Sequence, residues 1–283
     1  MVALESTLLA HGLPAPDNRR VADRVQAAVR AAGAMPATIA MLDGVARIGL
    51  DAAGLDRVCG GGLRKLSVRD LPLAAATGAD GATTVASTAY LAARAGIEVF
   101  ATGGLGGVHR GAATSFDESA DLLTLARVPI TVVCAGVKSI LDVGATLERL
   151  ETLSVPLVGY RTDRFAGFYL SDSGYPVPGR CDSPAEVAAL ARARDRIGLG
   201  AAVVVANPLP ADRQLDPALH QQVLAGALAD AAAAGVTGKD MTPFLLAAFH
   251  ERTEGASLAV NVELVLANAA LAGQIAVELA GHT

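Results

Sequence analysis

The chain has 283 residues, enough for one large domain or two small ones, and its formal net charge is −5. That charge, the lack of a basic block, an aromatic content of 4% and the absence of Trp argue against nucleic acid as a partner. The mean hydropathy of +0.42 reflects alanine, and because no run of about 18 apolar residues is uninterrupted, we expect no transmembrane helix.

The N-terminus and the cysteines indicate the compartment. The opening MVALESTLLAHG lacks the basic start and the small-residue cleavage site of a signal peptide. Cys59, Cys134 and Cys181 are odd in number and far apart, which is typical of reduced thiols and not of a disulfide framework or a zinc site. We therefore expect a cytoplasmic protein that does not bind a membrane.

Strand-like and helix-like segments alternate along the chain. Asp43-Gly44 is a two-residue turn signal inside a hairpin, and Ser183 is the expected N-cap of a later helix. The alanine-rich stretches 223–234 and 262–281 are expected to be helical. The other predicted elements, in chain order, are a strand at 2–6, a helix at 16–33, the hairpin at 37–50, a helix at 83–96, a strand at 97–102, a helix at 116–127, a strand at 129–136, a helix at 140–152, a strand at 155–160, a helix at 183–198 and a strand at 201–210.

This alternation predicts the fold class. Continuous apolar strands separated by helices are typical of a parallel or mixed sheet covered on both faces. Because no long linker and no internal repeat interrupts the pattern, we expect residues 1–283 to form a single-domain α/β/α sandwich with a mixed, mostly parallel central sheet. In such sheets ligands bind outside the carboxyl ends of the strands, so the residues that follow each strand are the candidates for function.

Glu5 follows the first predicted strand. It is an exposed edge-strand carboxylate, a partner for a nearby Arg or, if its strand is central, a partly buried acid. Burial would raise its pKa and suit it to general-acid catalysis near neutral pH.

A glycine-rich segment, TGGLGGVHRG (102–111), follows a later strand. Its glycines either allow a tight turn with close backbone packing or bring backbone N–H groups to an anion. The spacing matches neither a Rossmann fingerprint nor a Walker A loop. His109 and Arg110 add a possible proton carrier and a possible phosphate partner.

The segment SFDESADLL (115–123) is expected to begin a helix. Ser115 and Glu118 fit a capping box, which accounts for one acid without any function. Asp117 and Asp121 have i, i+4 spacing, so on that helix they would share one face and repel each other. A divalent cation such as Mg²⁺ or Mn²⁺, or a cationic neighbour, would offset this repulsion.

Lys138 follows the apolar strand TVVC in a chain where Arg outnumbers Lys 20 to 3. A strand-end lysine is commonly an exposed group whose stem packs on apolar surface. Here the flanks VVCAG and SIL are apolar, and, unlike Arg, a desolvated lysine can lose its proton and form a Schiff base with a carbonyl. Lys65 and Lys239 are equally rare but lie in less apolar surroundings.

Long motifs, among them VALESTLLAHGLPAP, KLSVRDLP, the segment 81–122, TVVCAGVKSILD, VANPLP and GKDMTPFLL, resemble the pseudouridine-5′-phosphate glycosidase family, also called the indigoidine synthase A family. The resemblance runs nearly end to end. It implies reversible cleavage of the C–C glycosidic bond of pseudouridine 5′-phosphate to uracil and ribose 5-phosphate, through a lysine imine with the ring-opened sugar. It also implies an α/β/α sandwich and a homotrimer.

The resemblance assigns roles by position. Lys138 corresponds to the nucleophile, Glu5 to the proton donor, and Asp117 to the ligand of a metal ion, usually Mn²⁺, one per subunit. The positions that it implies for substrate binding are Lys65, Val85, His109, Ser119, Ala120, Asp121 and Asn261.

Two alternatives remain open from the sequence. One is a C-glycosynthase that joins ribose 5-phosphate to another acceptor, and the other is a catalytically silent nucleotide-binding homologue. Family members usually carry a couple of dozen residues before the first strand, whereas this chain starts four residues before Glu5, so we expect a short N-terminus that leaves the motif residues intact.

Overall fold

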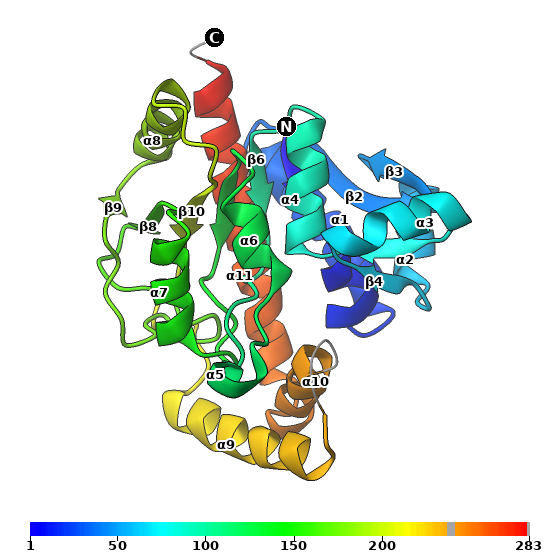
Figure 1. Cartoon of the computed structure of the whole chain (residues 1–283), viewed down its shortest axis with the longest axis vertical. Coiled ribbons are helices and arrows are strands. Elements are labelled where there is room, and N and C mark those ends of the chain that lie inside the picture. Colours follow the sequence, from blue (N-terminus) through cyan, green and yellow to red (C-terminus); the bar gives the residue numbers. More distant parts are fainter. Residues whose placement is uncertain (237–240, 282–283) are drawn as a thin grey trace.

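A ten-stranded mixed β-sheet forms the middle layer of the molecule (Figure 1). The computed structural model describes residues 1–236 and 241–281. The strands are β1 (Val2–Leu4), β2 (Pro36–Leu42), β3 (Val45–Ile48), β4 (Arg64–Leu66), β5 (Gly81–Thr83), β6 (Val99–Ala101), β7 (Thr131–Cys134), β8 (Leu157–Tyr160), β9 (Arg180–Cys181) and β10 (Val203–Ala206). Their order is β4-β5-β2-β1-β6-β7-β10-β8-β9, with β3 paired to β2.

The sheet is parallel from β2 across to β9, and β4 also pairs parallel with β5. Within the described residues, the antiparallel pairs are β2 with β3 and β2 with β5. The turn between β2 and β3 has positive φ at both Asp43 (53°) and Gly44 (71°), as a two-residue hairpin requires. The predicted hairpin and the mixed, mostly parallel sheet are confirmed.

Helices cover both faces of the sheet. The regular helices are α1 (Asp17–Ala31), α2 (Ala52–Cys59), α3 (Leu71–Thr77), α4 (Val85–Arg94), α5 (Ala112–Ser115), α6 (Ala120–Leu125), α7 (Val143–Thr152), α8 (Pro184–Arg196), α9 (Pro217–Ala233), α10 (Met241–Arg252) and α11 (Ala256–Ala280), together with a π-helical turn η1 (Leu8–Gly12) and a 3₁₀ turn η2 (Val68–Asp70). In Figure 1, α4, α6 and α7 lie in front of the sheet, whereas α11 lies behind it and packs against α1 and α8. The α/β/α arrangement is confirmed.

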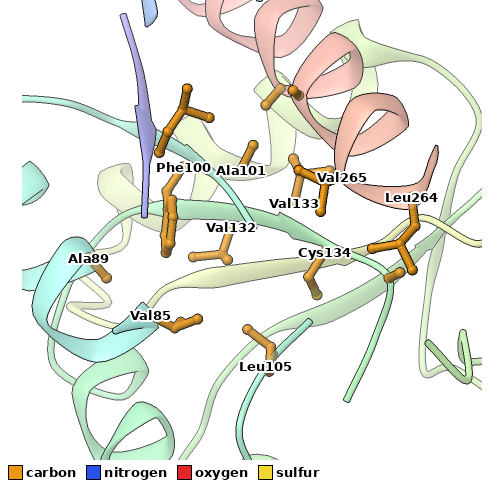
Figure 2. Packing of buried hydrophobic residues seen from close by; sticks show 14 of the residues in the cluster. Val85, Ala89, Phe100, Ala101, Leu105, Val132, Val133, Cys134, Leu264 and Val265 are labelled. Atoms are coloured by element: carbon orange, nitrogen blue, oxygen red, sulfur yellow. The ribbon is translucent and has the colours of Figure 1, made fainter. Parts of the chain in front are cut away.

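The core continues through the sheet from one helical layer to the other. Figure 2 shows Phe100 and Val132 on the side of α4, near Val85, whereas Val133 points to Val265 of α11. These side chains are at most 3% exposed, which explains why the strands are continuous apolar runs and do not alternate with polar residues. Within the described part of the chain, α11 alone is long and apolar enough to cross a membrane, but it packs on β6 and β7 as a core helix.

The helix predicted for 116–127 is wrong at its start. Phe116 has a φ of 55°, which breaks the helix, and α6 begins only at Ala120. Ser119 is the N-cap, its hydroxyl accepting from the N–H of Asp121, so the capping box of Ser115 and Glu118 does not form.

The physical reason is a competing partner for the backbone. The N–H of His109 donates to the Asp117 carbonyl at 3.0 Å, and the N–H of Ser119 donates to the Gly107 carbonyl at 2.9 Å. Residues 117–119 therefore pair in extended form with the glycine-rich segment. As a result, Asp117 lies outside α6, and the predicted repulsion of Asp117 and Asp121 on one helix face is absent.

Candidate active site

The site lies where the direction of strand order reverses. β1 and β6 are neighbours near the middle of the sheet; the chain continues from β1 to β2 on one side and from β6 to β7 on the other. Such a switch point opens a crevice at the carboxyl ends of the strands. A cavity of about 420 Å³ lies there, and Glu5, Gly103 and Lys138, which follow β1, β6 and β7, all line it.

Every residue that the resemblance assigns to the site lines this one cavity, whereas Arg110, the possible phosphate partner, does not line it and donates to the Ile140 carbonyl. The set comprises Glu5, Lys65, Val85, His109, Asp117, Ser119, Ala120, Asp121, Lys138 and Asn261. They come from strand ends, from the start of α4, from the segment before α6 and from α11. Lys239, the third lysine of the chain, lies outside the described residues.

Glu5 has the environment of a general acid. It follows central strand β1, and burial raises the pKa of its carboxyl group. Lys138 is the largest opposing influence, and the Thr102 hydroxyl, which donates a hydrogen bond to the Glu5 carboxylate, also favours the ionised form. The positive charge of Lys138 therefore acts on the Glu5 carboxyl group, and both residues line the cavity.

Lys138 reaches the cavity through a sharp turn after β7. Gly136 has a φ of 81°, and a Cβ atom on it would lie 2.0 Å from the Ala166 carbonyl oxygen, so glycine is required there. The N–H of Lys138 donates to the Leu105 carbonyl at 3.1 Å. The side chain is only half-buried, consistent with an amine that opens onto the cavity.

The glycine-rich segment packs closely against neighbouring side chains. A Cβ atom at Gly107 would lie 2.4 Å from the Thr146 hydroxyl oxygen. The N–H of Gly106 donates to Asp121 at 2.8 Å, and the N–H of Val108 donates to Thr146 at 2.9 Å. The close-packing interpretation is confirmed at Gly107, and the N–H groups of Gly106 and Val108 are already used within the protein, so those two are not available to hold an anion.

Asp121 joins two parts of the site. One carboxylate oxygen accepts from the N–H of Ala86, in the first turn of α4, at 2.9 Å, and the other accepts from the N–H of Gly106 at 2.8 Å. The residue is only 5% exposed. Asp121 therefore fixes the start of α4 against the glycine-rich segment at the wall of the cavity.

Asp117 is the carboxylate that fits the metal prediction best. Its oxygen lies 3.8 Å from Nδ1 of His109, whereas the neighbouring Glu118 is paired with Arg149 at 2.8 Å. Burial lowers the pKa of His109 despite the nearby Asp117 carboxylate, so at neutral pH its imidazole is uncharged. No group of three or more His, Cys, Asp or Glu side chains gathers among the described residues. The donors fit a cation held by one carboxylate with water or substrate oxygens, as Mg²⁺-type sites are, and not an all-protein cage.

Three buried polar atoms in the described cavity wall indicate a ligand. The Thr7 and Ser67 hydroxyl oxygens and the Asn261 amide oxygen have no hydrogen-bond partner, and all three residues line the cavity. Buried polar atoms are nearly always satisfied, so a polar molecule in the cavity would provide the missing partners.

Several cavity residues were missed from sequence. Thr7 and His11 come from η1 or the residue before it, and Thr242 and Leu246 come from α10. Burial, reinforced by the charge of Lys65, lowers the pKa of His11. The polar residues just after Glu5 and the motif GKDMTPFLL were the sequence features that could have indicated these residues. Neither feature specifies which side chains face the cavity.

Comparison with known proteins identifies the family. The chain matches the family described as indigoidine synthase A like protein over residues 1–278. The chain belongs to this family. It is 64% identical to a pseudouridine-5′-phosphate glycosidase of Salinispora tropica, over 100% of this chain and 88% of that protein. It is 62% identical to a protein of the same name from Frankia alni, over 98% of this chain and 77% of that one.

Two solved structures share the fold. The prealnumycin C-glycosynthase AlnA, in complex with ribulose 5-phosphate, superposes with a TM-score of 0.92 at 37% identity and covers 100% of this chain and 92% of its own. An indigoidine synthase A (IdgA)-like protein of Thermotoga maritima has a TM-score of 0.91 at 37% identity, over 98% of this chain and 92% of its own. The predicted family and fold class are confirmed.

Proposed function

We propose that this chain reversibly cleaves the C–C glycosidic bond of pseudouridine 5′-phosphate to give uracil and ribose 5-phosphate. The carrying observation is that Glu5 and Lys138 line the same switch-point cavity, where the charge of Lys138 acts on the Glu5 carboxyl group. Relatives named for this activity reach 64% identity over the whole chain. The C-glycosynthase alternative is not favoured, because the C-glycosynthase AlnA is only 37% identical.

The chemistry needs an amine and an acid. A C–C bond has no leaving oxygen to protonate, so a pair of carboxylates does not suffice. We propose that the Lys138 amine bonds to C1′ as the C1′–O4′ bond breaks; the electron pair of that bond stays on O4′, which takes up the proton that the amine loses, so the ring is opened. The C1′–uracil bond then breaks, its electron pair stays on the uracil carbon, and Glu5 donates a proton to that carbon. The sugar remains on Lys138 as an imine, which water hydrolyses to ribose 5-phosphate and free lysine.

The binding roles follow from the cavity wall. Lys65 supplies a positive charge for an anionic substrate, and Asn261 offers its unpaired amide oxygen. Val85, Ser119 and Ala120 shape the wall, and His109 is a neutral imidazole that can exchange a proton. Asp121 has a structural role at the cavity wall: its two carboxylate oxygens accept hydrogen bonds from the N–H groups of Ala86 and Gly106, and so hold α4 against the glycine-rich segment.

Asp117 would hold a divalent cation, Mn²⁺ in this proposal, one per subunit. Its location outside α6 and beside His109 supports this, since the other acid before α6, Glu118, is occupied by Arg149. A cation there would supply positive charge for substrate oxygens.

The assembly and location complete the proposal. We expect a cytoplasmic, single-domain protein that assembles as a homotrimer. The described cysteines are free and buried, which supports a reducing compartment. Sedimentation at equilibrium tests the trimer: a single species of the monomer mass would contradict it.

The deciding experiment combines product release with trapping. Uracil formation from pseudouridine 5′-phosphate is measured with and without Mn²⁺, and ribose 5-phosphate with borohydride is used to trap the imine as an amine on Lys138. We expect wild type to release uracil and form the adduct, and Lys138→Arg to do neither. The matched control is Lys65→Arg, which changes a cavity lysine but keeps Lys138 and must still form the adduct. An adduct on the Lys138→Arg protein would rule out the imine assignment.

A further inference from the structure

His220 is a buried histidine outside the cavity wall that contacts the segment carrying Lys138. It lies in the first turn of α9 and is 6% exposed. Its Nε2 atom lies 2.7 Å from the hydroxyl oxygen of Ser139, the residue directly after Lys138, and Ser139 is itself 7% exposed. A hydrogen bond between two buried side chains far apart in sequence is a specific contact that fixes their relative position.

The aromatic neighbours of His220 explain its burial but not this bond. Its ring centroid lies 5.3 Å from that of Phe249 and 6.3 Å from that of Tyr169. An apolar ring would fill the same space. Burial lowers the pKa of His220 to about 4, with the Arg110 charge acting in the same direction, so the imidazole is neutral at pH 7 and bonds to a hydroxyl without a charge.

The segment 138–142 is held on its other side by the glycine-rich segment. The N–H of Lys138 donates to Leu105, and Arg110 donates to the Ile140 carbonyl at 3.2 Å. On the opposite side, the segment is held by the hydroxyl of Ser139, which faces α9 and bonds to His220. The Lys138 backbone is thus fixed between two parts of the molecule.

The α9 helix is itself joined to the cavity. It packs against α10, which contributes Thr242 and Leu246 to the cavity wall, and Arg252 of α10 pairs with Asp230 of α9 (Figure 1). The hydrogen bond between His220 and Ser139 therefore connects the segment that carries Lys138, through α9, to the cavity-lining helix α10.

We propose that His220 is a positioning residue that sets the attack geometry of Lys138 through Ser139. The proposal rests on the proposed function, because it takes Lys138 to be the nucleophile. A nucleophile that is misplaced by a fraction of an ångström loses rate while substrate binding is retained, so the loss should be in kcat.

The test compares Ser139→Ala, His220→Leu and the double variant. Each single change should lower kcat for uracil release, and the rate of borohydride-trapped adduct formation, about tenfold, with KM within about twofold. Because both changes remove the same bond, the double variant should be no slower than the slower single variant. His220→Gln, whose amide can reach the hydroxyl, should restore most of the rate.

Asp230→Asn is the matched control, since it removes the exposed ion pair between α9 and α10 without touching Ser139, and it should keep the wild-type rate. Losses that multiply in the double variant, a Ser139→Ala protein that forms the adduct at the wild-type rate, or an equal loss in Asp230→Asn would each overturn the proposal. If His220→Leu fails to fold, Ser139→Ala and His220→Gln decide it alone. A wild-type protein that forms no adduct would instead remove the imine mechanism and this role with it.

Discussion

Glu5 illustrates how a single residue acquires chemistry from its surroundings. The same carboxyl group on an exposed edge strand would be an ordinary surface acid. On central β1 it is desolvated, which raises its pKa, while Lys138 and the Thr102 hydroxyl limit the rise and Asp121 adds to it. The pKa of Glu5 is thus raised because it follows a central strand, and a raised pKa is the direction that suits a general acid.

Thr102→Val should raise the pKa of Glu5 further, because the hydroxyl bond that favours the carboxylate is lost. Glu5 donates its proton in the protonated form, so the alkaline limb of the kcat profile for uracil release should move to higher pH. Thr102→Ser keeps the hydroxyl and should leave the limb in place. The charged groups facing Glu5, namely Lys138, Asp121 and Lys65, are the same in both variants. A limb that moves to lower pH in Thr102→Val would refute the assignment.

Gly136→Ala should destabilise the fold strongly. The residue has a φ of 81° and its new methyl group would meet the Ala166 carbonyl oxygen, so we expect a loss of more than about 2 kcal/mol in the free energy of unfolding by urea. Gly174→Ala is the matched control: its φ is 92°, but nothing lies within 4 Å, so it should cost about 1 kcal/mol from backbone strain alone. Equal losses would show that the Ala166 contact is unimportant.

At the scale of elements, part of the site is formed by an extended segment, residues 117–119, where the sequence predicted a helix. The segment before α6 gives up one helical turn to pair with the glycine-rich segment, which brings Asp117 beside His109 and leaves Asp121 at the start of α6. Two acids four residues apart thereby acquire different tasks. Asp121 holds backbone N–H groups, and Asp117 lies beside His109 and is the acid that we propose holds the cation.

Asp121→Asn should therefore act mainly on stability. The amide has one acceptor oxygen where the carboxylate has two, so one of the bonds to Ala86 and Gly106 is lost, at a cost of about 1–3 kcal/mol in unfolding free energy. Asp117→Asn should stay within about 0.5 kcal/mol of wild type, since its side chain is partly exposed, but it should lose the Mn²⁺ response of uracil release. Urea unfolding and metal titration measure the two effects, and the opposite pattern would exchange the two roles.

At the scale of the whole molecule, burial around the site makes the fold sensitive to acid. Burial lowers the pKa values of His11, His109 and His220, the last to about 4 from an ordinary value of 6.5. Between these values the unfolded chain binds protons that the folded chain does not. The unfolding free energy should therefore fall as the pH drops from about 6.5 towards about 4, whereas the raised pKa of Glu5 acts in the opposite direction.

The contribution of His220 can be separated by comparing wild type with His220→Gln. The variant removes one group that is protonated only in the unfolded chain, so its unfolding free energy should fall less than that of wild type between pH 7 and pH 4.5, roughly the window set by its two pKa values. Urea unfolding at several pH values measures the difference. A parallel decline in both proteins would mean that His220 titrates normally.

The sequence by itself determined the fold class, the order of the main elements and part of the cavity lining, whereas Thr7, His11, Thr242 and Leu246 were missed. Apolar runs and helical periodicity depend on which face of each element is buried, and strand-end residues such as Glu5 and Lys138 must gather at one edge of a parallel sheet. Only the tertiary structure decided the rest. It decided where α6 starts, which of the two acids Asp117 and Asp121 accepts backbone hydrogen bonds, and that His220 contacts Ser139. These features depend on contacts between segments far apart in the chain, and local periodicity does not encode such contacts.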